Sequence, residues 1–222
     1  MAKLKPVISL CLFLLFLSAP IAVLSKTSEA SKPNNDSDSA PFIHGHYVLG
    51  PTIKVNGYHP NEPTVVIVDK GSHLTHVLQW QGDEIARVLT IPNSTGKGAT
   101  PSPPGRYHIS EKDMNPVWEP PKSIKLPWNP DHKPVPPYNQ THKNPLGVAR
   151  ISLDKFNVAL HGTNQPKLLK KSVSHGCIRH NNSDIVKLYG MVDRGTVVYV
   201  VEHWRGHTIS QKDFKTNIAS GK

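Results

Sequence analysis

One cysteine lies among residues that could make it reactive. Cys177 ends the tetrapeptide Ser-His-Gly-Cys, and His161 lies a short distance upstream. A thiol attacks a carbonyl carbon as the thiolate, so a catalytic cysteine needs a nearby base or positive charge. His161, His175 and Arg179 could each supply one. Gly176 allows a sharp backbone turn, and the amides of that turn could stabilise an oxyanion. The pattern therefore predicts nucleophilic catalysis by Cys177.

The N-terminus indicates that this thiol works outside the cytoplasm. Residues 1–25 combine two early lysines, the apolar run Val7 to Leu17 and a small residue at position 25, as secretory signals do. The alternative is an uncleaved membrane anchor, for which the run is short. The other cysteine, Cys11, falls inside the run and would be removed with it. Exported proteins normally pair their cysteines, so a lone Cys177 is either an accident or a reactive thiol.

Further motifs give the cysteine a family context. His161-Gly162-Thr163-Asn164 followed by Ser174-His175-Gly176-Cys177-Ile178-Arg179 resembles the active-site motif of the L,D-transpeptidases, whose catalytic domain is YkuD-like. Thr100 to Tyr107 (TPSPPGRY) is similar to that family's TP-x-G-x-(Y/F) element, with an extra Ser-Pro inserted. Two more segments are similar to bacterial periplasmic members: Asn115 to Trp118 and Asn144 to Gly147. The resemblance covers about Pro63 to His203.

This resemblance implies a role for each site residue. The nucleophile would be Cys177 and the general base His161, with the amides near Gly176 and Cys177 as the oxyanion hole. The expected site-shaping residues are Ser174, His175, Gly176 and Gly162. The expected substrate-binding residues are Arg179, Thr163 and Asn164. The residue types alone leave alternatives: Arg179 fits a structural ion pair equally well, and Thr163 and Asn164 fit turn positions.

The implied activity is peptidoglycan L,D-transpeptidation. The thiolate would attack the carbonyl at the L-centre of diaminopimelate in a tetrapeptide stem and release D-alanine. The resulting thioester would pass to an amine, on a second stem or on a wall-attached protein. The cysteine proton could move to His161 before the substrate arrives. The expected partners are stem peptides, wall-attached protein and carbapenem-type inhibitors, and the mechanism needs no cofactor.

Three alternatives remain open on the sequence. A carboxypeptidase or hydrolase of wall peptides would use the same Cys177 and His161, so the motif does not separate it from a transferase. A non-catalytic wall-binding domain has no reason to keep a nucleophile and its base. A papain-type protease carries its cysteine early and its histidine far downstream, whereas here His161 precedes Cys177.

Charge and histidine content add weaker expectations. The formal charge of +10 favours anionic partners such as wall polymers, although a merely soluble basic surface fits equally well. No arginine-rich or aromatic-interleaved basic stripe indicates nucleic acid. The 13 histidines form only loose pairs without a completing cysteine or glutamate motif, so no metal site is expected. The protein is predicted to be exported, and the family resemblance implies that its location is the periplasm.

The elements that must position these residues are predicted to be mainly strands. The abundance of Pro and Gly favours a β-rich fold, and the resemblance implies a β-sandwich-like domain with one or two short helices. The expected strands are Thr64–Val68, Leu74–Trp80, Glu84–Thr90, Gly105–Ser110, Val148–Leu153, Asn157–His161 and Thr196–Val201. Gln81-Gly82-Asp83 reads as a hairpin turn. A short helix capped by Asn182 or Ser183 is expected before the last strand.

The predicted domain order is simple. Residues 1–25 form the signal, 26–41 a flexible spacer, 42–203 the catalytic domain with its core at 63–203, and 204–222 a polar tail that frays. No stable membrane span is expected after signal cleavage. Pro101 to Pro145 holds twelve of the 21 prolines together with two tryptophans. Such a long irregular loop is expected to be a lid or binding loop, or else a decorative insertion.

Overall fold

The structure is a computed structural model that describes residues 46–49, 57–82, 84–204, 207–210 and 213–214. The expected signal at 1–25 and spacer at 26–41 lie outside the described residues and stay predictions. In the described ranges, no helix has both the length and the apolar character needed to cross a membrane.

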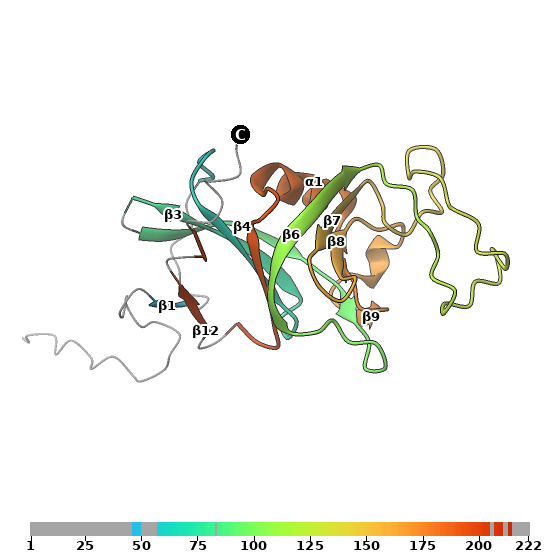
Figure 1. The fold of residues 1–222 in the computed structure, drawn as a ribbon, viewed down its shortest axis with the longest axis horizontal. Coiled ribbons are helices and arrows are strands. Elements are labelled where there is room, and N and C mark those ends of the chain that lie inside the picture. The colour runs from blue at the N-terminus through green and yellow to red at the C-terminus, as the bar shows by residue number, and fades with distance from the viewer. Residues whose placement is uncertain (1–45, 50–56, 83, 205–206, 211–212, 215–222) are drawn as a thin grey trace, which may run out of the picture. The chain divides into compact units, whose positions relative to one another are not determined.

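The fold is mainly β, as predicted, and is built on one curled eight-stranded sheet (Figure 1). Its strand order is β10-β8-β7-β6-β11-β2-β3-β4. The bounds are β2 Thr64–Asp69, β3 Leu74–Gln81, β4 Glu84–Pro92, β6 Gly105–Met114, β7 Ala149–Leu153, β8 Ala159–His161, β10 Ile178–Arg179 and β11 Val197–Val201. Two-stranded sheets join β1 (His46–Leu49) to β12 (His207–Ser210) and β5 (Thr95–Gly96) to β9 (Ser172–Ser174). A 3-10 turn, η1, spans Pro166–Leu168.

The β-branched run of β2 is explained by its central place in the sheet. β2 pairs with β11 on one side and β3 on the other, and all six of its residues are buried. Val66 and Val68 face the larger core, while Val65 and Ile67 face a second apolar cluster on the opposite side. A strand covered on both faces needs apolar residues at consecutive positions, because alternate side chains point to opposite faces.

One helix closes the larger core beside the site strands. α1 (Asn182–Met191) buries Ile185 and Leu188 against β7 and β8. Its cap is Asn181, whose side chain accepts the Ser183 amide at 3.2 Å, so the predicted cap at Asn182 or Ser183 is wrong by one or two positions. The reason is that Asn181 has the extended backbone that a capping residue requires, whereas Asn182 already begins the helix.

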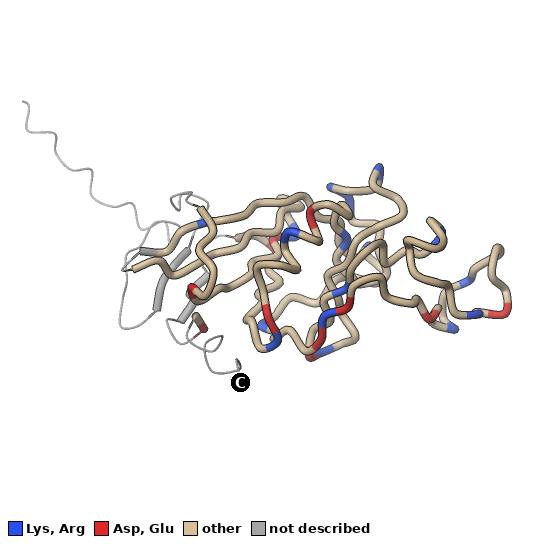
Figure 2. Tube along the Cα trace, turned by 90° about the horizontal axis from the view of Figure 1, so that it is seen from above, with Lys and Arg blue, Asp and Glu red and all other residues tan. Residues whose placement is uncertain are grey.

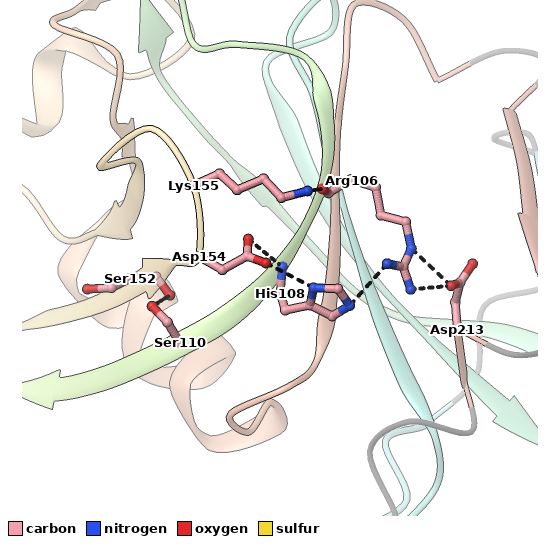
Figure 3. Close-up of polar contacts among 7 residues, drawn as sticks. All are labelled: Arg106, His108, Ser110, Ser152, Asp154, Lys155 and Asp213. Atoms are coloured by element: carbon pink, nitrogen blue, oxygen red, sulfur yellow. Dashed lines mark hydrogen bonds and ion pairs between the residues drawn. The ribbon is translucent and has the colours of Figure 1, made fainter.

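The expected fraying of the C-terminal tail is wrong for the described residues 213 and 214. Asp213 accepts two hydrogen bonds from the Arg106 guanidinium, at 3.0 and 2.6 Å, next to the His108–Asp154 pair (Figure 3). Phe214 is 1% exposed and packs in the second apolar cluster. The polar composition of the tail hides these two anchors, because one buried ring and one paired carboxylate suffice to hold a segment. The rest of 211–222 lies outside the described residues.

The Pro-rich segment between β6 and β7 contains no regular strand from 115 to 148, and it extends away from the sheet in Figure 1. The preceding strand β6 runs to Met114, beyond the predicted end at Ser110, because Lys112, Asp113 and Met114 pair with β7. A β-bridge between Trp118 and Val135 ties the two halves of the segment together. The segment is therefore irregular but internally bonded.

Candidate active site

The sheet topology brings the predicted nucleophile and base together. β8 and β10 are parallel neighbours, and His161 pairs with Arg179 in their register. Cys177 directly precedes β10, and extending the parallel register by one residue puts it beside Ala159, the first residue of β8. Cys177 and His161 line one cavity of about 650 Å³. Strand pairing thus brings Cys177 to the strand that ends in His161, although a loop and a turn separate the two residues in the sequence.

His161 is held as a neutral imidazole. It is 4% exposed, and its Nδ1 lies 2.7 Å from the Gly162 carbonyl oxygen. Burial, and then the positive charge of Arg179, lower the pKa of His161 to about 4, against the opposing effect of the Gly162 and Pro145 carbonyls. Because a carbonyl only accepts, Nδ1 must carry the hydrogen, which leaves the Nε2 lone pair free to act as a base.

Cys177 rests as a thiol. Its Sγ donates to the Asn157 carbonyl oxygen at 3.8 Å. Burial raises the pKa of Cys177, although the Ala159 amide and the charges of Arg179 and Arg150 lower it in part. A raised thiol pKa beside a lowered imidazole pKa disfavours the thiolate–imidazolium pair that the sequence allowed before substrate arrives. Any loss of this proton requires the thiol to leave the Asn157 carbonyl.

The turn before the nucleophile is fixed by Ser174. Its hydroxyl donates to the Cys177 carbonyl at 2.5 Å and accepts the Gly176 amide at 3.2 Å. Gly176 has φ of +112°, a conformation that favours glycine, as the predicted sharp turn requires. The Gly176 amide is thus engaged within the turn, whereas the Cys177 amide makes no hydrogen bond inside the described part of the chain. This favours Cys177 as the oxyanion donor of the predicted pair.

Two cationic side chains, Arg179 and Lys143, line the cavity. Asn164 and the exposed His175 also line it. No carboxylate among the described residues forms an ion pair with Arg179, so the structural ion pair considered as its alternative role is not found there. A guanidinium without an ionic partner can receive a carboxylate from a bound molecule.

These features agree with comparisons to known proteins. The family model described as the L,D-transpeptidase catalytic domain, YkuD, matches residues 63–200, more than half of the chain. The chain belongs to the L,D-transpeptidase family. That match confirms the family resemblance of the sequence motifs.

Curated relatives and solved structures carry the same family name. The Bacillus subtilis L,D-transpeptidase YkuD is 31% identical over 111 residues, which are 50% of this chain and 52% of that protein. The Escherichia coli L,D-transpeptidase YcfS is 29% identical over 153 residues, 68% of this chain and 48% of that protein. L,D-transpeptidase 3 of Mycobacterium tuberculosis is 20% identical with a TM-score of 0.49, covering 64% of this chain and 62% of that one. The chain spans about half the length of the curated relatives it matches.

Not every predicted site residue of this L,D-transpeptidase family member lines the cavity. Gly162 and Thr163 do not line the cavity. The Thr163 hydroxyl accepts the Gln165 amide at 3.0 Å, so Thr163 is a turn residue, one of the two roles considered for it. A Cβ on Gly162 would lie 2.2 Å from the Asn182 side-chain oxygen, so glycine permits a close approach there.

Asn182 is a positioning residue that sequence reasoning missed. Its side-chain oxygen accepts the Thr163 amide at 3.0 Å and the Val148 amide at 3.4 Å. These bonds connect the start of α1 to the backbone that follows His161. The sequence offered Asn182 only as a helix cap, and nothing in its local pattern signals the longer-range contacts.

The Pro-rich segment supplies the apolar wall of the cavity. Trp118, Ile124, Leu126 and Trp128 all line it. The two tryptophan rings are stacked, with centroids 6.3 Å apart. The sequence flagged this segment as a candidate lid. It lines the same cavity as Cys177 and His161, and its role as a lid stays a prediction.

The described residues show neither a basic stripe nor a metal-ligand cluster. Figure 2 shows Lys and Arg positions distributed over many elements rather than along one stripe. Among the residues that the structure describes, no group of three or more His, Cys, Asp or Glu side chains is arranged to hold a metal ion.

Proposed function

We propose that this member of the L,D-transpeptidase family is a peptidoglycan transpeptidase in which Cys177 is the nucleophile and His161 the base. The observation that carries the proposal is that both residues line one cavity whose charged wall residues, Arg179 and Lys143, are positive. A donor stem peptide ends in a carboxylate, and hydrogen bonds between charged groups are the stronger ones. Arg179 would bind that carboxylate.

The first half-reaction follows from the resting protonation states. The Cys177 thiol leaves the Asn157 carbonyl and gives its proton to His161 Nε2 while Sγ attacks the carbonyl carbon at the L-centre of diaminopimelate. The Cys177 amide stabilises the oxyanion. When the tetrahedral intermediate collapses, the C–N bond to D-alanine breaks and His161 protonates the leaving amine. The product is a thioester on Cys177.

The second half-reaction returns the enzyme to its resting state. An acceptor amine, on a second stem or on a wall-attached protein, attacks the thioester while His161 accepts its proton. The C–S bond breaks and the thiol is restored with that proton. Water would compete as acceptor, and transfer requires that it be kept away. The apolar wall formed by Trp118 and Trp128 supports transfer over hydrolysis.

The cellular setting of the proposal rests on the N-terminal sequence. The signal-like residues 1–25 support export, and the substrate of this reaction lies outside the cytoplasmic membrane. We place the enzyme in the periplasm on the resemblance of its motifs to periplasmic members. Carbapenem-type compounds are expected to acylate Cys177, because they present a strained carbonyl to the same nucleophile.

Incubation of the purified protein with tetrapeptide wall fragments tests this function by mass spectrometry. Cross-linked dimers and free D-alanine are expected with the wild type. Cys177→Ala should reduce their rate at least about 10⁴-fold, since the covalent route is lost, while thermal unfolding changes little. Dimers formed at the wild-type rate by Cys177→Ala would rule out the nucleophile, and shortened monomers without dimers would establish the hydrolase instead.

A further inference from the structure

Ser102 lies in the Ser-Pro insertion of the TPSPPGRY segment, far along the chain from the nucleophile. It is fully buried, and its hydroxyl forms two hydrogen bonds. It accepts the Gly96 amide at 2.9 Å and donates to the Gly176 carbonyl oxygen at 2.7 Å. We propose that Ser102 is a positioning residue that aims the Cys177 amide at the oxyanion. The proposal rests on the acyl transfer proposed above.

The two bonds of Ser102 have a fixed direction. A backbone amide can only donate, so the hydroxyl oxygen receives the Gly96 hydrogen. The hydroxyl hydrogen is therefore available for the Gly176 carbonyl, which can only accept. The buried surroundings exclude water as a substitute partner, and an unmade bond there is costly. Ser102 thus holds the Gly176 carbonyl oxygen against the β5 backbone.

Holding that oxygen also orients the Cys177 amide. The carbonyl of Gly176 and the N–H of Cys177 belong to the same planar trans peptide unit, in which they point in opposite directions. Ser102 on the carbonyl side therefore directs the N–H away from itself. Gly176, with φ of +112°, has the conformational freedom to let this unit rotate, so an external lock has an effect.

The remaining bonds of the turn do not replace this lock. The Gly176 amide is held by Ser174, and the Ser174 carbonyl accepts from the Thr100 hydroxyl at 3.2 Å and from the Lys97 amide at 3.1 Å. These contacts act on the peptide units before Gly176. The Cys177 amide makes no hydrogen bond among the described residues, so its direction depends on the carbonyl at the other end of its peptide unit.

The test compares two reactions of the same thiol. Acylation by a carbapenem passes through an oxyanion, whereas alkylation by iodoacetamide displaces iodide at a saturated carbon and forms none. Both rates are measured on the full-length protein at one pH by intact mass, with Cys177→Ala as the blank. The variants are Ser102→Ala, Ser102→Thr, which keeps a hydroxyl, and Thr100→Val, which removes the neighbouring bond to the Ser174 carbonyl.

Ser102→Ala should slow acylation about tenfold or more, a fraction of the 10²- to 10³-fold loss seen when an oxyanion donor is removed outright. Its alkylation rate should stay within about twofold of wild type. Ser102→Thr should recover most of the acylation rate, and Thr100→Val should lose little of it. If Ser102→Ala were acylated at the wild-type rate, or if its acylation and alkylation rates fell by the same factor, the proposal would be overturned. A wild type that alkylates but never acylates would instead refute the acyl transfer itself.

Discussion

His161 lies between two arginines in the sheet. In the sheet register, His161 pairs with Arg150 of β7 on one side and Arg179 of β10 on the other. Arg150 is neutralised by Asp113, with bonds of 3.0 and 2.6 Å, whereas Arg179 faces the cavity. Positive charge beside a buried imidazole favours its neutral form, and the same charge favours a thiolate. With burial acting on both groups, the result at rest is a neutral imidazole beside a protonated thiol.

The resting protonation states predict how Cys177 responds to pH. Alkylation by iodoacetamide needs the thiolate, and burial raises the pKa of Cys177. We expect the alkylation rate to climb until the pH exceeds the pKa of an ordinary cysteine, without a plateau near neutrality. The measurement is the rate of mass increase from pH 5 to 10, with Cys177→Ala as the blank. A plateau between pH 5 and 8 would instead indicate a thiolate–imidazolium pair at rest.

Among the elements, the Pro-rich segment is held together by the hydrogen bonds of one buried side chain. Asn144 is fully buried, and its Nδ2 donates to the Pro116 and Pro136 carbonyls, each at 2.9 Å. Its side-chain oxygen accepts the Leu146 amide at 2.9 Å. Proline supplies no amide hydrogen of its own, so a loop rich in proline needs side-chain donors for its carbonyls. Asn144 is therefore the internal tie of the apolar wall.

Replacing this tie should loosen the wall while leaving the sheet intact. Asn144→Ala removes the donor from the carbonyls of buried Pro116 and exposed Pro136, and the buried carbonyl left unpaired costs about 1–3 kcal/mol. We expect trypsin to cut faster at Lys122 and Lys125. We also expect the ratio of hydrolysed to cross-linked wall fragments to rise. The control is Asn129→Ala, whose side chain donates to the Lys133 carbonyl in an exposed turn of the same segment. Equal cleavage of Asn144→Ala and wild type would show that the prolines alone hold the segment.

At the scale of the whole molecule, the described residues include three buried histidines that are neutral in the fold. Burial is the main cause in each case, and it lowers the pKa of His76 and His161 to about 4 and that of His180 to about 3. Each would take up a proton in the unfolded chain near pH 6.5. Between these pH values the unfolded state binds more protons than the folded state, so the free energy of unfolding falls as the pH falls.

As the pH falls from 6.5 to the folded pKa, each such histidine should lower the free energy of unfolding by about 1.4 kcal/mol per pH unit. Urea denaturation at a series of pH values measures this slope. Carboxylates contribute in the same range, so the test is the difference from His76→Gln, which should remove one histidine's share. Exposed His59→Gln is the matched control. Identical slopes for wild type and His76→Gln would show that His76 is protonated in the fold.

The sequence by itself determined the type of most elements and singled out Cys177 and His161 as the candidate reacting pair. The β-branched run of β2, the hairpin between β3 and β4 and the strand ending in His161 all follow local periodicity, which depends on near neighbours. Cys177 and His161 could be chosen because the residues around them carry a family motif. These predictions needed no knowledge of long-range contacts.

The tertiary structure decided which distant groups complete the site. Ser102 and Asn182 hold the backbone around Cys177 and His161 through hydrogen bonds that local sequence does not encode. The anchoring of Asp213 and Phe214 and the resting thiol at Cys177 likewise depend on burial and on partners from other strands. Periodicity is a property of neighbours along the chain, whereas protonation, buried hydrogen bonds and packing are properties of the folded surroundings. The sequence therefore predicted the nucleophile, and the fold set the protonation state of that thiol and the hydrogen bonds around it.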